Sequence, residues 1–335
     1  MARFARLWLR TFFQVLWARW RRGPLRPTWS LMLETTVTYL RSDFMELATW
    51  PIPEARTTLE GRPLPRDATS RVERTVVADG PLRGEWIRSA AASEPVAGVV
   101  LYLHGGSFLF GSPRTHADTL ARLALATDRP VLAPEYRLAP EHPYPAQLED
   151  ALAALAGLEA MGVPRARIVV AGESAGANLA LALALALRDR GEPQPAGLAL
   201  ISPWLDLTSS ADSHRRNVAF DYGTAEILRA QARLFAGTLP LDDPRLSVGN
   251  ADPAGIAPAF LQVGTAELLL DECRAWAEKA RAAGVALTVD EPVDMPHAPP
   301  FFASVCPQGV AAIDAVAAFV RRRLASDGSN TKPER

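Results

Sequence analysis

Residues 167–176 read RIVVAGESAG, an apolar, β-branched run that leads directly into Gly172-Glu173-Ser174-Ala175-Gly176. The apolar run predicts a buried strand. Residues 179–187 then alternate leucine and alanine, a spacing that a strand could also show. Because both residues are strong helix formers and neither is β-branched, we predict a buried helix there. The stretch therefore indicates a strand, a tight turn and a helix.

Ser174 has the sequence setting of a catalytic nucleophile. A serine hydroxyl attacks poorly unless a base removes its proton and its surroundings stabilise the oxyanion that forms. A sharp turn from strand to helix exposes that hydroxyl, and it leaves room only for glycine two positions to either side. A serine in an ordinary glycine-rich turn could show the same five letters, but it would not need the flanking strand and helix. We therefore predict that Ser174 is a nucleophile.

Apolar runs alternate with helical patterns along most of the chain. Strands are predicted at residues 72–77, 84–88, 96–103, 130–135, 167–171, 197–201, 259–263 and 285–289, and helices at 115–127, 146–161, 178–189, 272–283 and 310–324. Strands that alternate with helices of this length predict an α/β fold, in which a mostly parallel central sheet has helices on both faces.

The sequence pattern also divides the chain into parts. Residues 1–60 are predicted as N-terminal cap helices and a wrap, with the proline-rich stretch 50–65 as a linker or extended segment. Residues 61–325 form the predicted catalytic domain, which carries a helical cap insertion at about 204–257 because strand-like runs are missing there. Residues 326–335 (SDGSNTKPER) are expected to be a disordered tail.

A second glycine-containing motif follows the run at 96–103. It reads His104-Gly105-Gly106-Ser107. Consecutive glycines let backbone N–H groups point into a pocket, and such a loop commonly forms an oxyanion hole with the amide that follows the nucleophile. We therefore predict Gly105, Gly106 and Ala175 as the donors, although a simple glycine turn would read the same.

The base that activates Ser174 should be a histidine, and the chain has five. His104 belongs to the glycine loop, where its ring is expected to brace the backbone. His116 and His142 precede the nucleophile, against the order serine, acid, histidine that this arrangement follows. His214 lies in the predicted insertion. His297 remains, between the last predicted strand and the last helix, and we predict it as the base.

The acid that orients this histidine should follow the strand at 259–263. Glu267 stands just past that strand, whereas Asp271 and Glu272 begin the next helix, where a carboxylate is favoured by the helix dipole alone. We predict Glu267 as the acid and keep Asp271 as the alternative.

Bulk composition excludes several functional classes. A hydrophobic content of 48% and a charged content of 22% over 335 residues are typical of a soluble enzyme with a large core. A net charge of -1 argues against nucleic acid as a partner. Cys273 and Cys306 are too few for a disulfide framework or a cysteine-based metal site, so we expect no metal and a reducing, cytoplasmic location.

The N-terminal segment has an unusual composition. Residues 1–28 carry seven arginines and no acidic residue, and five of the eight tryptophans lie within the first fifty residues. Arg10 and Arg19 interrupt the apolar run, so neither a signal peptide nor a membrane span is expected. A basic, aromatic, amphipathic helix fits a cap that buries its aromatic residues against a lid or a partner subunit. It also fits peripheral contact with an anionic membrane. The cap is favoured, while membrane association and a homodimer stay open.

Taken together, these motifs carry a resemblance to a known family. The segments HGGS (104–107), EYRLAPE (135–141), GESAG (172–176), SPWLDL (202–207) and the loop to His297 resemble the bacterial hormone-sensitive-lipase-like (family IV) carboxylesterases of the α/β-hydrolase fold. The resemblance covers about residues 95–325. It implies a carboxylesterase without cofactor or metal, and a cap built from the N-terminal helices and the insertion after SPWLDL.

Three positions depart from the family pattern. Ser107 stands where a third glycine is usual, Glu173 where aspartate is common, and Glu267 where an aspartate followed by proline is more frequent. Ser107 thereby puts the third donor of the oxyanion loop in question. The segments GSPRTH and YRLAPEHPYPA are also similar to monoterpene lactone hydrolases.

The resulting hypothesis is a serine carboxylesterase that hydrolyses short- to medium-chain acyl esters, small molecules, through Ser174, His297 and Glu267 and an acyl-enzyme. A lactone hydrolase is one alternative. A catalytically silent ligand receptor is another, since gibberellin receptors resemble this family but lack the histidine. Ser107, Phe108 and Trp204 are candidates for substrate binding, with packing against the cap as the other reading of both aromatic residues.

Overall fold

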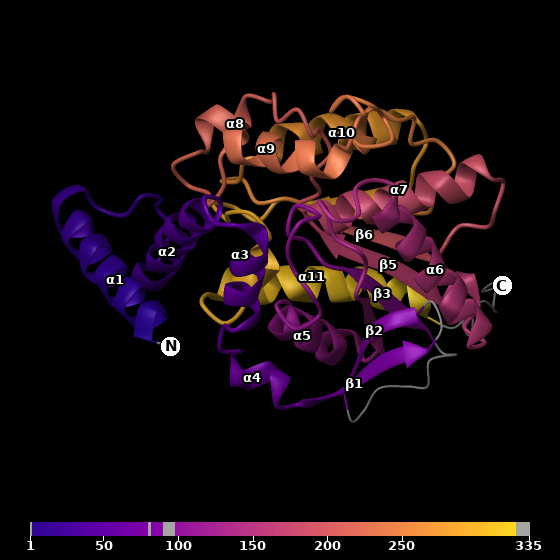
Figure 1. Ribbon diagram of the computed structural model, residues 1–335, viewed down its shortest axis with the longest axis horizontal. Coiled ribbons are helices and arrows are strands. Elements are labelled where there is room, and N and C mark those ends of the chain that lie inside the picture. Colours follow the sequence, from indigo (N-terminus) through magenta and orange to yellow (C-terminus); the bar gives the residue numbers. More distant parts are fainter. Residues whose placement is uncertain (1, 80–81, 90–97, 326–335) are drawn as a thin grey trace, which may run out of the picture.

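The computed structural model describes residues 2–79, 82–89 and 98–325 (Figure 1). The expected disordered tail at 326–335 and the first two residues of the strand predicted at 96–103 lie outside this part of the chain. Within it, strands alternate with helices along most of the chain, as the sequence predicted for an α/β fold.

An eight-stranded sheet forms the centre of the molecule, in the order β1-β2-β4-β3-β5-β6-β7-β8. Its strands are β1 (Val72–Asp79), β2 (Leu82–Ser89), β3 (Val99–Leu103), β4 (Val131–Pro134), β5 (Ile168–Glu173), β6 (Gly197–Ile201), β7 (Ala259–Gln262) and β8 (Leu287–Asp290). β2 pairs antiparallel with β1 and with β4, and all other neighbours are parallel. The mostly parallel sheet is confirmed, with strand ends that differ by a few residues from the predicted ones.

Helices cover both faces of this sheet, because alternate residues of each buried strand point to opposite sides. Leu101 and Val170 pack into one core with α6 (Ala146–Ala160), α7 (Ala175–Asp189) and α10 (Leu270–Ala282). Val100 and Val169 pack into a second core with α5 (Ala117–Thr127) and α11 (Pro307–Leu324). The leucine–alanine segment is the buried helix α7, as its composition predicted.

Four helices precede the sheet: α1 (Ala2–Arg22), α2 (Leu31–Leu47), α3 (Ile52–Glu60) and α4 (Arg66–Thr69). The prediction of a linker or extended wrap at 50–65 is wrong over most of its length, because α3 lies there. Pro51 is the residue before this helix and Pro53 lies in its first turn. Proline is tolerated at a helix start, where its missing N–H would have no partner in the helix.

The chain between β6 and β7 is helical and irregular. It contains α8 (Ser213–Arg216) and α9 (Ala225–Ala236) and no strand, as expected for residues 204–257, all of which the structure describes. Phe235 of α9 stacks on Phe108 with ring centroids 3.7 Å apart, and it meets Tyr144 edge-on. This contact fastens the segment to the loop that follows β3.

Glycines allow β5, α7 and the end of β3 to approach one another closely. A Cβ atom on Gly172 would collide with the backbone of Gly176 and Leu103, and a Cβ atom on Gly176 would collide with the carbonyl oxygens of Leu103 and His104. The obstacles are backbone atoms, which cannot turn aside as a flexible side chain can. The turn between β5 and α7 therefore requires glycine at both positions.

We predict that Gly176→Ala lowers the free energy of unfolding by about 3 kcal/mol or more, because the added methyl group overpacks a backbone contact. Gly284→Ala is the matched control: its Cβ meets open space, and its φ of +79° leaves only a conformational cost of about 1–2 kcal/mol. Urea denaturation of both variants measures the difference. Equal losses of unfolding free energy in the two variants would contradict the close approach of α7 to the end of β3.

Candidate active site

Ser174 lies in the turn between β5 and α7, in a backbone conformation that few residues adopt. Its φ is 56° and its ψ is -121°. The turn is held on both sides: the Ser174 N–H donates to Ile201 O at 3.0 Å, and Ser174 O accepts from the N–H groups of Ala177 and Asn178. A side chain in such a strained position stands clear of the sheet edge, which is the setting expected for a nucleophile.

His297 and Glu267 form a direct pair. Nδ1 of His297 lies 2.7 Å from Oε2 of Glu267, whose side chain is fully buried. The other carboxylate oxygen accepts from the Ser202 hydroxyl at 2.9 Å and from the backbone N–H of Gly264. Asp271, the alternative acid, instead pairs with Arg216 at 2.7 Å on the surface. The structure therefore brings Glu267, and not Asp271, to the histidine.

This pairing changes how His297 titrates. Burial by itself lowers the pKa of the imidazole, but the hydrogen bond and the negative charge of Glu267 outweigh it and hold the pKa above the ordinary value of 6.5. Burial in turn raises the pKa of the Glu267 carboxyl, against the opposing effect of His297. A buried carboxylate at Nδ1 stabilises an imidazolium, which is the species that forms when a histidine accepts a proton.

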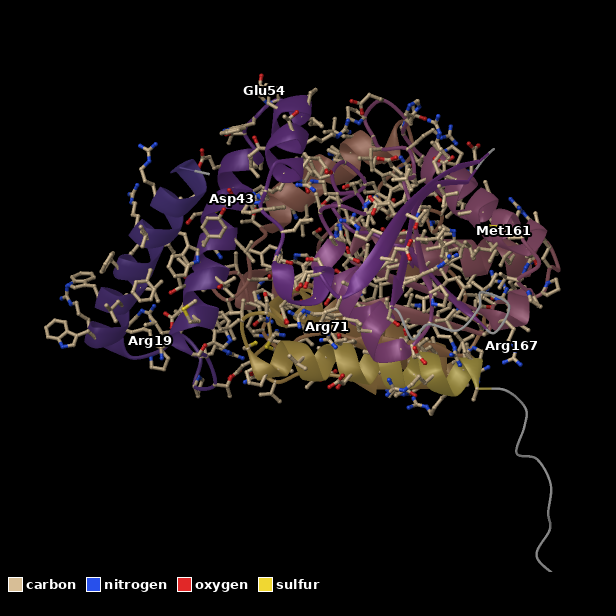
Figure 2. The ribbon with its side chains drawn as sticks, turned by 90° about the horizontal axis from the view of Figure 1, so that it is seen from below. Arg19, Asp43, Glu54, Arg71, Met161 and Arg167 are labelled. Atoms are coloured by element: carbon tan, nitrogen blue, oxygen red, sulfur yellow. The ribbon has the colours of Figure 1, made fainter. Side chains whose placement is uncertain are left out.

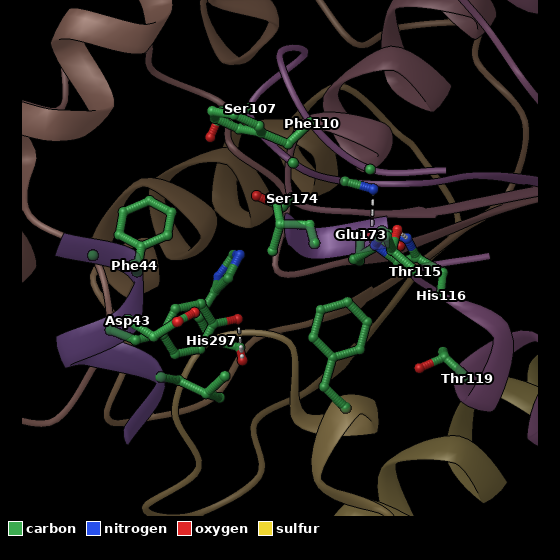
Figure 3. Close-up of a pocket in the computed structure, with 18 of the residues that line it drawn as sticks. Asp43, Phe44, Ser107, Phe110, Thr115, His116, Thr119, Glu173, Ser174 and His297 are labelled. Atoms are coloured by element: carbon green, nitrogen blue, oxygen red, sulfur yellow. Dashed lines mark hydrogen bonds and ion pairs between the residues drawn. The ribbon is translucent and has the colours of Figure 1, made fainter. Parts of the chain in front are cut away.

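Ser174 and His297 line one cavity of about 460 Å³. In Figure 3 the His297 ring points toward the Ser174 side of this cavity. None of the described residues donates or accepts a hydrogen bond at the Ser174 hydroxyl. In a structure without substrate, catalytic hydrogen bonds are often open in this way. Much of the wall is apolar. It comes from α2, from α9, from the chain after β3, β6 and β7, and from the segment before α11: Leu40, Phe44, Leu47, Phe110, Trp204, Leu228, Leu268, Phe301, Phe302 and Val305.

The predicted oxyanion loop lies beside Ser174, but one of its assigned donors is wrong. The Gly105 N–H donates to Oε1 of Glu173, so it is not available to a substrate oxygen. No acceptor among the described residues takes the N–H groups of Gly106, Ser107 or Ala175, and Gly106, Ser107 and Ser174 line the cavity. The free amides of this loop are thus shifted one residue along the chain from the predicted set.

Two residues of the same loop adopt positive φ angles, 55° at Ser107 and 62° at Phe108. Ser107 lines the cavity, as expected of a substrate-binding candidate, and so does Trp204. The prediction for Phe108 is wrong, because its ring is fully buried between Phe235 and Trp204 and does not reach the cavity wall. Phe110, two residues on, lines the cavity instead.

A buried charged pair supports the predicted oxyanion loop at the Gly105 amide. Nε2 of His116 lies 2.8 Å from the Glu173 carboxylate that holds the Gly105 amide (Figure 3). Burial opposes both charges, but their mutual attraction prevails, so the pKa of His116 is raised and that of Glu173 is lowered. His104 stacks on Tyr136 and contacts Gly105 O at 2.8 Å, and burial lowers its pKa to about 4. The His104 ring therefore braces the loop as a neutral group, as predicted.

Sequence reasoning missed the residues that hold His297 from the other side. Asp221 accepts the backbone N–H of His297 at 3.3 Å and that of Leu268 at 2.8 Å. The Tyr222 hydroxyl donates to His297 O at 3.1 Å. Both residues belong to the irregular segment between α8 and α9, where no motif or periodicity distinguished them.

Comparisons with known proteins agree with this geometry. The family model described as alpha/beta hydrolase fold (Abhydrolase_3) matches residues 100–301. An acetyl-hydrolase of Streptomyces hygroscopicus is 41% identical over 73% of this chain and 82% of its own. The carboxylesterase NlhH of Mycobacterium tuberculosis is 32% identical over 90% of this chain and 97% of its own. A solved esterase from the bacterial hormone-sensitive lipase family superimposes with a TM-score of 0.78, at 35% identity, over 86% of this chain and 98% of its own.

The chain belongs to the α/β-hydrolase family. The resemblance of its motifs to the hormone-sensitive-lipase-like esterases is confirmed, and it is a carboxylic ester hydrolase.

We predict that Glu267→Ala and Asp271→Ala separate the two candidate acids. Only Glu267 contacts His297, so its loss should lower kcat by about 10³-fold or more, whereas Asp271→Ala should stay within about twofold of the wild type. Steady-state hydrolysis of a p-nitrophenyl ester measures both. A heavier loss in Asp271→Ala would contradict the pairing.

A second prediction concerns the buried pair of His116 and Glu173. His116→Ala leaves the Glu173 charge without its cationic partner and should cost about 3–5 kcal/mol of unfolding free energy. Because the folded-state pKa of His116 is raised, this contribution is complete below pH 6.5 and is lost as the pH rises through the raised pKa. Urea denaturation at several pH values tests this, with the exposed His142→Ala as the control. If His116→Ala and His142→Ala lose equal amounts of unfolding free energy at every pH, the stabilising role of the His116–Glu173 pair is refuted.

Proposed function

We propose that this chain hydrolyses carboxylic esters by a two-step acyl transfer in which Ser174 is the nucleophile, His297 the general base and acid, and Glu267 the residue that orients the histidine. The observation that supports this most is the 2.7 Å contact between His297 Nδ1 and Glu267, in the wall of the same cavity that Ser174 lines. The family relationship to esterases supports the reaction class.

In the first step His297 removes the Ser174 proton. Because Nδ1 is bound to Glu267, Nε2 is the nitrogen left to accept it. The serine oxygen then bonds to the ester carbonyl carbon, and the carbonyl oxygen becomes an oxyanion. Glu267 stabilises the imidazolium through its charge, without taking the proton itself.

The oxyanion is held by backbone amides. We assign this role to Gly106, Ser107 and Ala175, whose N–H groups have no acceptor among the described residues. Gly106 and Ser107 line the cavity together with Ser174, and Ala175 follows Ser174 directly in the chain. Donors fixed in advance stabilise the developing charge without having to reorganise. The positive φ of Ser107 keeps the loop in this orientation, so a serine at that position serves as a third donor in place of glycine.

In the second half of the reaction the imidazolium returns its proton. His297 protonates the leaving alcohol as the bond from the carbonyl carbon to that oxygen breaks, which leaves an acyl group on Ser174. Water then attacks this acyl-enzyme with His297 as base, and the carboxylic acid departs as Ser174 recovers its proton.

The cavity favours short- to medium-chain acyl esters. Its volume of about 460 Å³ and its apolar wall suit a modest acyl or alcohol group, with Ser107 and Trp204 beside the reacting centre. We propose that residues 1–60 and the insertion at 204–257 act as its cap, since α2 and the segment before α9 supply part of the wall.

Lactones are the closest rival substrates, because GSPRTH and YRLAPEHPYPA resemble lactone hydrolases. A p-nitrophenyl ester series of increasing chain length, run beside a panel of lactones, separates the two. A silent receptor is the rival from another class, and the paired, buried acid at His297 argues against it.

Ser174→Ala should lower kcat on p-nitrophenyl butyrate by several orders of magnitude, because it removes the atom that forms the acyl-enzyme. Ser209→Ala, a buried serine away from the cavity lining, is the control for a simple loss of packing and should keep most of the activity. Retained turnover in Ser174→Ala would refute the mechanism.

The pH profile gives an independent test. His297 must be neutral to act as a base, and its pKa is raised above 6.5 by Glu267. The acidic limb of kcat/KM should therefore lie above pH 6.5, with activity falling as the pH falls through it. In Glu267→Gln the residual activity should show that limb at lower pH, since the charge that raises the pKa is gone. An unmoved limb would contradict the assignment.

A further inference from the structure

Helix α1 presents an aromatic stripe to solvent. Phe13 and Trp20 are 63% and 83% exposed, well beyond what a large apolar side chain on a folded domain usually shows. The exposed apolar residues recur at the spacing of one helix face: Leu9, Phe13, Leu16, Trp17 and Trp20. A cap helix was predicted to bury its aromatic residues against a lid or a partner subunit. Within this chain the rings of Phe13, Trp17 and Trp20 are exposed.

The opposite face of α1 is firmly attached to the protein. Thr11 and Val15 are buried against its neighbour α2. Arg19 and Arg22 both bind the fully buried Glu34 of α2, at 2.7 Å and 2.8 Å. Figures 1 and 2 place α1 at one end of the molecule, outside α2. The stripe is therefore held in a fixed outward orientation.

Positive charge lies beside this stripe. Arg10 and Arg21 are exposed and follow the same side of the helix as Trp17, and the Arg21 guanidinium lies over the Trp17 ring at 4.7 Å. Residues 1–28 contain no acidic side chain to offset these charges. Tryptophan and arginine together on one exposed helix face are typical of a helix that lies in the headgroup region of a membrane.

We propose that the exposed face of α1 docks this enzyme peripherally on an anionic phospholipid bilayer, with the aromatic stripe inserted among the headgroups and Arg10 and Arg21 against lipid phosphates. None of the described helices is long and apolar enough to cross a membrane, so the contact is with the surface. A second copy of this chain fits the exposed face of α1 less well than an anionic membrane does. Two such helices placed face to face would bring arginines together with no acid between them.

Docking in this way would bring the active site close to lipid. α2, which carries Leu40, Phe44 and Leu47 of the cavity wall, packs directly on α1. Packed helices lie about 8–10 Å apart, so one wall of the cavity would stand a single helix away from the headgroups.

Vesicle flotation tests the proposal on the full chain. The protein should float with vesicles of equal parts phosphatidylcholine and phosphatidylglycerol, and should bind pure phosphatidylcholine vesicles far less. Trp17→Ala/Trp20→Ala should weaken binding at least about tenfold through lost apolar burial. Arg10→Gln/Arg21→Gln should weaken it roughly 30-fold, and added salt should reproduce that loss.

Controls separate docking from folding and from catalysis. Met161→Ala removes an exposed apolar side chain at the other end of the molecule (Figure 2) and should bind like the wild type. All these variants should keep their activity on soluble p-nitrophenyl butyrate, and Ser174→Ala should still float. Binding that ignores lipid charge, or no binding, would overturn the proposal. So would a concentration-dependent dimer in sedimentation that Trp17→Ala/Trp20→Ala abolishes while vesicles stay unbound.

Discussion

Ser174 keeps a backbone conformation of φ 56° and ψ -121° because β5 and α7 meet with no side chain between them. Gly172 and Gly176 let the start of α7 lie against the carbonyl oxygens that end β3 and begin the oxyanion loop. The same close approach sets the loop amides beside the serine and lets Glu173 reach the Gly105 N–H. Ser174, the loop that follows β3 and the Glu173 carboxylate are thus positioned by one backbone contact.

The parallel sheet brings the remaining groups to the same edge. Glu267 follows β7 and His297 follows β8, so both emerge where β5 delivers Ser174. The two buried carboxylates, Glu267 and Glu173, differ in their electrostatics: the pKa of Glu267 is raised and that of Glu173 is lowered. Glu267 pairs with His297 and raises the pKa of that imidazole, whereas Glu173 pairs with the buried His116 and accepts the backbone N–H of Gly105. Two buried carboxylate–histidine pairs therefore lie close to Ser174, and His297, His116 and Glu173 all line the same cavity.

The sequence was sufficient for the features that local pattern determines. The strand–turn–helix around Ser174 and the buried strands could be predicted from periodicity and motif, and chain order selected the histidine that the structure pairs with Glu267. Gly105 was assigned wrongly because its partner Glu173 lies 68 residues away, and no local pattern shows which amide such a contact occupies. The prediction that Phe108 binds substrate was wrong for a related reason. Its positive φ and its stacking on Phe235 exist only in the folded chain. No motif or periodicity in the sequence indicated that Asp221 would bind the backbone of His297.

The central claim is that one serine in this chain is activated by His297 and its buried acid. Treatment with a fluorophosphonate, followed by digestion and peptide mass spectrometry, tests it most directly, because only an activated serine reacts rapidly with this reagent. The account predicts a single adduct on the peptide that carries Ser174, formed rapidly in the wild type and lost in His297→Gln. An adduct on another residue, or equal labelling in His297→Gln, would contradict it.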